Sequence, residues 1–257
     1  MIKQQGRLRS DLETAAKWLQ ERGKAAASLL KTAQGGATIL VNGSRIQMGG
    51  NLTVKKNITV TIHKYSAKRL DTTVSMLAKV FVTNPLHIST FGPQRIDQNR
   101  LFFRIGLRHM FTGQAFVALV DDQVRGYIHF NPSPNCLPAP EEIPLVATTL
   151  LKPLGEAIPQ VIKWFARWCH LDPEEPHVHL GPIGVTPEAQ GQGIGTALMN
   201  RYIEHLKREQ SAGYLETDKP ENVEFYKKFG FAVRRQEQLI GTTVWYMWRP
   251  RDNATQI

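Results

Sequence analysis

The stretch HLGPIGVTPEAQGQGIGTALM, residues 179–199, decides the fold that this sequence predicts. An apolar run ending at Val185 gives way to a loop that carries Gly191, Gly193 and Gly195, and a helix-like pattern follows. Glycines let backbone N–H groups approach an anion closely, and the helix dipole places roughly half a positive charge at the start of the helix. The stretch therefore predicts a loop that binds phosphate groups.

The spacing of the glycines excludes two common classes of phosphate-binding loop. A P-loop needs a lysine directly after its last glycine, and none is present. The dinucleotide fingerprint G-x-G-x-x-G fails because Thr196 or Leu198 stands where its third glycine belongs. The pattern that remains is Gln190-x-x-Gly193-x-Gly195.

A second block, YLETDKPENVEFYKKFGF at residues 214–231, reads as a strand followed by a short helix. Asn222 and Tyr226 are four residues apart and share one face of that helix. Phe225 and Phe229 share a neighbouring face that we expect to be core, and Gly230 supplies a left-handed cap.

Together the two blocks closely resemble the GNAT acyltransferase superfamily. The match also includes the closing TTVWYMWRP, and it is most similar to the branch that contains puromycin N-acetyltransferase and related small-amine acetyltransferases. The similarity covers roughly residues 58–250. It implies an α/β fold with a mixed central sheet, in which the strands before residues 185 and 217 splay apart to admit acetyl-CoA.

The resemblance also implies a site. The pantetheine arm of acetyl-CoA would lie along Ile183, Gly184 and Val185, with Gly184 giving close approach. Asn222, Phe225 and Tyr226 would border the arm on its other side. The pyrophosphate would be surrounded by backbone N–H groups of the loop, namely Gln190, Gly191, Gln192, Gly193, Ile194, Gly195 and Thr196.

Catalysis in the superfamily is direct attack of an amine on the thioester, without an acyl-enzyme. The N–H of Val185 would polarise the carbonyl oxygen, and Tyr226 matches the general-acid position that protonates the leaving thiolate. An alkyl amine is mostly protonated at neutral pH and must lose a proton first, for which Glu216 is the candidate base.

Substrate specificity in the superfamily would lie in the helix bearing Phe102 and Phe103 and in the proline-rich segment 131–176. Phe103, Trp164, Glu175 and His179 are the candidate acceptor-binding residues, although the helical spacing of Trp164, Phe165 and Trp168 is more typical of core.

We expect no metal. His177 and His179 alternate on one strand face and could be ligands, but the sequence shows no further ligand pattern beside them. Cys169 and His170 are sequence neighbours, which does not make a nucleophilic pair, and we expect a buried structural cysteine.

The chain divides into three parts: an N-terminal basic extension over residues 1–57, a domain over 58–250 and a tail over 251–257. The extension carries ten basic and three acidic residues, whereas the remaining 200 residues of the 257 are nearly balanced, so most of the formal charge of +10 lies in the extension. Within it we expect a helix over 10–33 and turns at Asn42-Gly43 and Gly49-Gly50. This uneven distribution makes nucleic acid an unlikely class of partner.

The first residues lack the apolar core of a secretory signal, no window is long enough for a membrane span, and only two cysteines occur. We therefore expect a cytoplasmic protein, monomeric or homodimeric, that acetylates a small-molecule amine. Two alternatives stay open: a protein lysine or N-terminal acetyltransferase, and a non-catalytic acyl-CoA-binding module with a basic docking arm.

Overall fold

The computed structural model describes residues 37–39, 59–136, 146 and 151–252. The helix expected over 10–33, the turns expected at Asn42-Gly43 and Gly49-Gly50, and most of the tail lie outside the described residues. One short piece of the predicted extension, Ala37–Ile39, pairs antiparallel with the first strand of the predicted domain.

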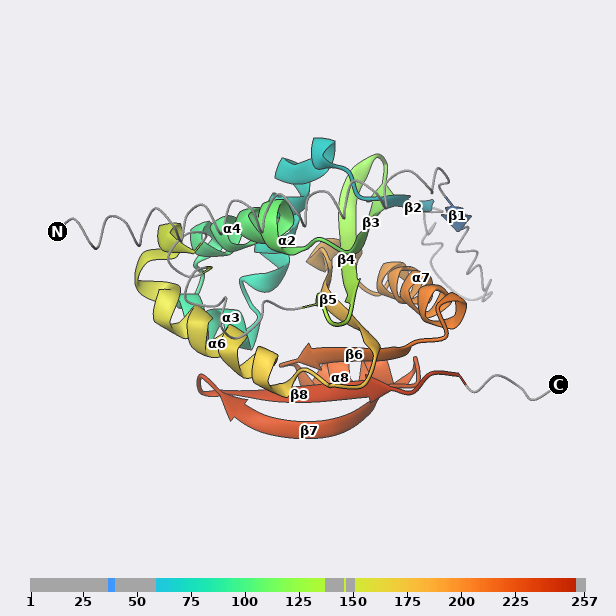
Figure 1. The fold of residues 1–257 in the computed structure, drawn as a ribbon. Helices are drawn as coiled ribbons and strands as arrows, with labels where there is room; N and C mark the ends of the chain where they lie inside the picture. Colours follow the sequence, from blue (N-terminus) through green and yellow to red (C-terminus); the bar gives the residue numbers. More distant parts are fainter. Residues whose placement is uncertain (1–36, 40–58, 137–145, 147–150, 253–257) are drawn as a thin grey trace, which may run out of the picture.

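The strands form one mixed sheet in the order β1-β2-β3-β4-β5-β6-β8-β7 (Figure 1). All neighbours pair antiparallel except β5 and β6, which are parallel and joined by a helical crossover. This confirms the predicted mixed α/β sheet. The strands are β1 (Ala37–Ile39), β2 (Val60–Lys64), β3 (Gln114–Val120), β4 (Gln123–Pro132), β5 (His177–Val185), β6 (Ala212–Thr217), β7 (Ala232–Leu239) and β8 (Thr242–Arg249).

Helices cover both faces of this sheet. Figure 1 shows α2, α3, α4 and α6 gathered on one side of β3, β4 and β5, with α7 on the other. No helix in the described part of the chain is long and apolar enough to cross a membrane. The α-helices are α2 (Leu70–Phe81), α3 (Pro85–Phe91), α4 (Ile96–Ile105), α6 (Ile158–Leu171), α7 (Ile194–Arg208) and α8 (Pro220–Lys227).

The local sequence explains most of these boundaries. The β3–β4 hairpin turns at Asp121 and Asp122, and both residues have positive φ, which aspartate tolerates better than most residues. Helix α3 was not predicted. It begins where Asn84 accepts a hydrogen bond from the His87 N–H at 3.1 Å and Pro85 occupies the first helical position.

Two hydrophobic cores result, one on each face. The first lies under α2, α4 and α6 and is rich in aromatic side chains such as Phe103 and Trp164. The second lies under α7 and α8 and includes Ile128, Leu198 and Met199, each at most 1% exposed. Their burial is the main favourable term in folding, and it fixes both sheet faces against helices.

The sheet opens between β5 and β6, as the family resemblance implied. The parallel register runs from His177↔Ala212 to Leu180↔Leu215 and stops there, although both strands continue. Gly181 and Pro182 follow directly. Pro182 has no N–H to donate, and β5 carries one extra residue here against β4, where the register passes from Phe130↔Leu180 to Ile128↔Ile183. A bulge bends a strand and ends local pairing, so this Gly-Pro pair accounts for the gap.

Candidate active site at the gap between two strands

The glycine loop has the geometry expected of an anion cradle. After Val185 the chain makes a short 3-10 turn and enters α7 through Gly191 and Gly193, whose φ angles of 73° and 81° favour glycine. The first helical hydrogen bond is donated by the Ala197 N–H to the Gly193 carbonyl at 2.9 Å. The N–H groups of Ile194, Gly195 and Thr196 therefore have no carbonyl one turn before them, and they lie at the positive end of the helix dipole.

The backbone of β5 presents further polar groups to the gap. The Thr186 N–H donates to the Arg125 carbonyl of β4 at 2.8 Å. Because successive residues of a strand direct their N–H groups to opposite edges, the N–H groups of Val185 and Ile183 point away from β4 and into the gap. The Val185 carbonyl, on the same edge, accepts from the Gln190 side chain at 3.1 Å.

Gly184 has a packing reason of its own. A Cβ at this position would lie 2.9 Å from Val80 Cγ1, so the bare backbone lets α2 approach the strand. The contact with α2 explains the glycine without reference to a ligand, and a role in approach of the pantetheine arm stays a prediction.

Helix α8 supplies the facing wall. Asn222 and Tyr226 both line a cavity at the gap, as their four-residue spacing predicted. Phe225 turns to the other side and packs over Gly195 of α7, where a Cβ would lie 3.5 Å from its ring. Burial, with the Asp218 carboxyl nearby, raises the pKa of the Tyr226 phenol above its usual value, so this hydroxyl stays protonated at neutral pH.

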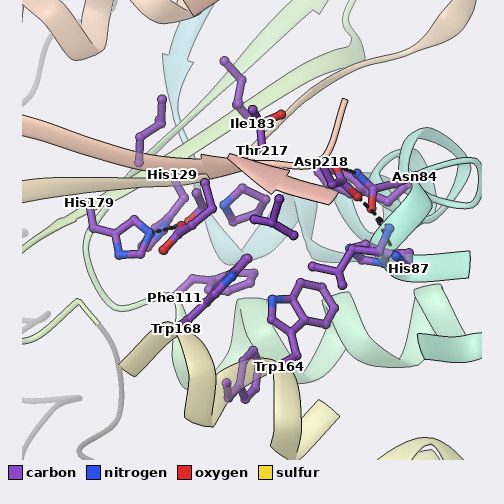
Figure 2. Close-up of a pocket in the computed structure, with 18 of the residues that line it drawn as sticks. Asn84, His87, Phe111, His129, Trp164, Trp168, His179, Ile183, Thr217 and Asp218 are labelled. Atoms are coloured by element: carbon purple, nitrogen blue, oxygen red, sulfur yellow. Dashed lines mark hydrogen bonds and ion pairs between the residues drawn. The ribbon is translucent and has the colours of Figure 1, made fainter. Parts of the chain in front are cut away.

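The cavity has a volume of about 160 Å³ and is lined mainly by aromatic side chains from α4 and α6 together with the ends of β5 and β6 (Figure 2). Phe103, Trp164 and His179, three of the predicted acceptor-binding residues, are among them. The indole N–H groups of Trp164 and Trp168 are buried without a hydrogen-bond partner. Such unpaired donors at an apolar wall suit a ligand that carries an acceptor.

Glu216 lies in the wall of this cavity. Its side chain is only 2% exposed, and Oε2 accepts a hydrogen bond from His179 Nε2 at 2.7 Å. The second oxygen, Oε1, has no partner. The carboxylate thus combines one fixed contact with one unpaired lone-pair site, an arrangement that can receive a cation or a proton.

Asp218, two residues further on, is a carboxylate that the sequence analysis missed. It accepts from the Leu86 N–H at 2.6 Å and from Asn84 Nδ2 at 2.7 Å, and burial raises its pKa. These bonds fasten the end of β6 to the N-terminus of α3. An aspartate directly after a strand was a visible signal, but its partners lie more than 130 residues away.

Two histidines of the cavity wall were also missed. His129 donates from Nδ1 to the Gly181 carbonyl at 2.7 Å and accepts the Gly113 N–H at Nε2, 3.1 Å away. Burial lowers the pKa of His129 to about 4 and that of His87 to about 3. Both rings are therefore neutral at pH 7, and both nitrogens of His129 are engaged, Nδ1 with the bulge and Nε2 with the chain just before β3.

Glu175 does not join the others. It lies outside the cavity lining, and its carboxylate pairs with Arg234 at 2.9 Å on the surface.

The sequence showed no further ligand beside His177 and His179, and here the structure differs. It brings Cys136 and Asp172 to the two histidines, and one potential ligand atom from each of the four residues lies within 4.8 Å of the others. Cys169 lies outside this set, and burial raises the pKa of its thiol to about 12.

The family model for the acetyltransferase (GNAT) family matches residues 86–231, more than half of the chain. The chain belongs to this family. GNAT enzymes use acetyl-CoA as co-substrate, and the open edge of β5 with the N–H groups in the first turn of α7 fits such a ligand.

Solved structures share the GNAT fold. A Corynebacterium glutamicum protein described as histone acetyltransferase HPA2 and related acetyltransferase aligns with a TM-score of 0.58 at 19% identity, covering 76% of this chain and 98% of its own. A Drosophila melanogaster polyamine N-acetyltransferase aligns at 0.55 and 13% identity, with 74% and 98% covered. A mosquito protein named arylalkylamine N-acetyltransferase like 5b aligns with a TM-score of 0.54 at 15% identity, with 74% of this chain and 99% of its own covered. At these identities the likeness concerns the fold alone.

Proposed function

We propose that this GNAT protein transfers the acetyl group of acetyl-CoA to the primary amine of a small molecule with an apolar body. The observation that carries the proposal is the joint placement of three features. The inward edge of β5 and the hydroxyl-bearing Tyr226 border one gap, and this gap leads into a partly enclosed aromatic cavity with the Glu216 carboxylate in its wall.

The donor side would be held by backbone groups. The N–H groups from Gly191 to Thr196 would bind the pyrophosphate, and the free edge of Ile183 and Val185 would pair with the pantetheine arm as an extra strand would. Asn222 and Phe225 would border the arm on the α8 side. Acetyl-CoA supplies an acyl group activated as a thioester.

The residues of the cavity would then handle charge and protons. Glu216 would accept one proton from the ammonium group, which frees the nitrogen lone pair to form the C–N bond. The Val185 N–H would stabilise negative charge on the carbonyl oxygen as the C–S bond breaks. Tyr226 would donate its proton to the departing sulfur, and the proton released by the new amide nitrogen would restore the phenol. Its raised pKa keeps Tyr226 in the protonated form that this step requires.

The shape of the acceptor side supports a small amine over a protein lysine. Trp164, Phe165 and Trp168 of α6 line the cavity, and α6 belongs to the proline-rich segment that could act as a cover. A volume of about 160 Å³ is close to that of an engineered cavity of roughly 150 Å³ that holds benzene, so an apolar body of about one ring fits. A protein acceptor would need an open groove beside Tyr226.

The resemblance to the puromycin N-acetyltransferase branch supports the same class of acceptor. So do the names of two structural neighbours, a polyamine N-acetyltransferase and a protein named arylalkylamine N-acetyltransferase like 5b. The acceptor itself is best sought among arylalkylamines and short alkylamines.

The test is release of the CoA thiol from acetyl-CoA against a panel of such amines and lysine-containing peptides. We expect turnover with a small amine, and a fall of about 10²- to 10⁴-fold for Tyr226→Phe and for Glu216→Gln. Tyr65→Phe is the matched control, because Tyr65 lies outside the cavity lining and should keep wild-type turnover. Equal rates for Tyr226→Phe and wild type would reject the acid role, preference for the peptides would favour the protein alternative, and failure to bind acetyl-CoA would reject the whole proposal.

A further inference from the structure

A cluster of potential metal ligands lies beside the cavity, and its members come from separate segments of the chain. Cys136 follows β4, Asp172 directly follows α6, and His177 and His179 lie on β5. The sequence separates Cys136 from Asp172 by 36 residues. The fold therefore assembles this cluster, and no short motif encodes it.

Four distances between the ligand atoms are close to those of a tetrahedral site. Cys136 Sγ lies 3.5 Å from Asp172 Oδ1 and 3.7 Å from His177 Nε2. Asp172 Oδ1 lies 3.4 Å from His177 Nε2 and 3.7 Å from His179 Nδ1. Zinc bonds of about 2.3 Å to sulfur and 2.0–2.1 Å to nitrogen and oxygen, at tetrahedral angles, separate neighbouring ligands by roughly 3.3–3.6 Å.

Each imidazole has its outer nitrogen already engaged. His177 Nδ1 is 2.8 Å from the Glu175 carbonyl, which can only accept, so this nitrogen carries a hydrogen and Nε2 is the nitrogen that faces the cluster. His179 Nε2 donates to Glu216 in the same way, which leaves Nδ1 facing the cluster. Histidines that bind a metal usually donate their other ring N–H to a carbonyl or a carboxylate in this way.

One further observation points to a missing ligand. His179 Nδ1 is buried without a hydrogen-bond partner, and the side chain is only 7% exposed. A buried nitrogen of this kind is costly to leave unpaired, and it is aimed at the space between Asp172 and Cys136.

We propose that Cys136, Asp172, His177 and His179 bind one zinc ion. A thiolate with two imidazoles and one carboxylate is a set that suits zinc, whereas magnesium and calcium prefer oxygen ligands throughout. Four protein ligands make a closed, structural site. Zinc binds a thiolate and imidazole nitrogens without hydrogen, so binding would release to solvent the protons held on Cys136 Sγ, His177 Nε2 and His179 Nδ1.

The consequence for the molecule is mechanical. The ion would fasten the end of α6 and the segment after β4 to the paired half of β5, on the side where α6 covers the cavity. It would also fix the His179 ring, and through the 2.7 Å contact the Glu216 carboxylate. This inference rests on the cluster and is independent of the acceptor that the enzyme uses.

The test uses the full chain without a histidine tag, stripped with a chelator and titrated with Zn²⁺. We expect one zinc per chain, a higher Tm with zinc than without, and apparent affinity at least about 100-fold weaker in Cys136→Ser and in Asp172→Asn. With Co²⁺ in place of zinc, we expect the visible bands of a tetrahedral ion and a thiolate-to-cobalt charge-transfer band that Cys136→Ser abolishes. Cys169→Ser and His63→Gln remove one thiol and one imidazole outside the cluster and should bind as wild type does.

Far-ultraviolet circular dichroism shows whether each variant folds, and metal content is read without reference to acetylation. A wild-type chain that folds but takes up no zinc at micromolar concentration would overturn the proposal. So would zinc binding that survives Cys136→Ser, or that is lost equally in Cys169→Ser. A failed amine panel with normal zinc binding would count against the proposed function alone.

Discussion

His87 should make the stability of this protein depend on pH, and the size of the effect follows from its surroundings. The ring lies among Phe81, Phe91, Phe102, Phe103 and Trp164, with centroid distances of 4.9–5.7 Å. Among the described residues, the ring makes one hydrogen bond, which Nδ1 donates to Asn99 Oδ1 at 2.6 Å. Burial lowers the pKa of His87 from 6.5 to about 3, so the folded state keeps the ring neutral where the unfolded chain protonates it.

The sign and magnitude follow from linkage. Above pH 6.5 neither state is protonated and His87 contributes no pH dependence; as the pH falls from 6.5 towards 3, the unfolded state is favoured by up to about 1.4 kcal/mol per pH unit. At about pH 5 this amounts to roughly 2 kcal/mol lost relative to pH 7. The other lowered histidine of the wall, His129, adds a loss of the same sign, so the comparison must be made between variants.

The assay is urea unfolding at about pH 7 and about pH 5 for wild type, His87→Asn and His63→Gln. Asparagine can place an amide nitrogen near the position of Nδ1 but does not titrate. We expect His87→Asn to be less stable at pH 7 because it loses ring packing, yet to lose roughly 2 kcal/mol less than wild type between the two pH values. The exposed His63 should leave the wild-type pH dependence intact. If His87→Asn loses as much stability as wild type on acidification, the neutral buried ring is not the cause.

Two further perturbations test the gap between β5 and β6. Gly184→Ala should lower the free energy of unfolding by about 1–3 kcal/mol in urea, because the new methyl group meets Val80. Gly181→Ala is the control: nothing lies within 4 Å of its Cβ position, so stability should change by less than about 0.5 kcal/mol. Equal losses in the two variants would refute the packing account. The Gln190 amide holds the glycine loop against the Val185 carbonyl, so Gln190→Ala should raise the KM for acetyl-CoA. The increase should be several-fold, because one net hydrogen bond contributes roughly 1 kcal/mol. An unchanged KM would show that the loop is held by its backbone alone.

Local chemistry in the sequence predicted the parts of the site that are encoded locally. The loop before α7 and the shared face of Asn222 and Tyr226 depend on residues within a few positions of one another, and the structure agrees with both. Helix α3 was not predicted because seven residues give too little hydrophobic periodicity, although the sequence contains a helix-start signal at Asn84-Pro85.

Contacts between distant segments could not be predicted in this way. Asp218 reaches the N-terminus of α3, and Cys136 reaches His177, only because the sheet order places those segments side by side. A pair of histidines on one strand face is compatible with many surroundings, so the missing ligands had to be supplied by topology. Glu175 is the opposite case: it lies close in sequence to β5, which lines the cavity, yet its side chain pairs with Arg234 on the surface and does not enter the cavity.

The Gly181-Pro182 bulge explains why one strand serves two different purposes. Before it, His177 and His179 point to the face covered by α6, where Trp168 and Tyr214 contact the His179 ring. After it, the odd-numbered Ile183 and Val185 pack on the opposite face, towards α7. One extra residue reverses the alternation of a strand, so strict alternation through HVHLGPIGV would have placed all four on one face. The reversal also frees the edge of the second half, because the same two residues end the pairing with β6. A straight β5 would therefore keep its ladder to β6 and lose the gap, which makes the dipeptide, more than the glycine loop that follows it, the feature that opens the site.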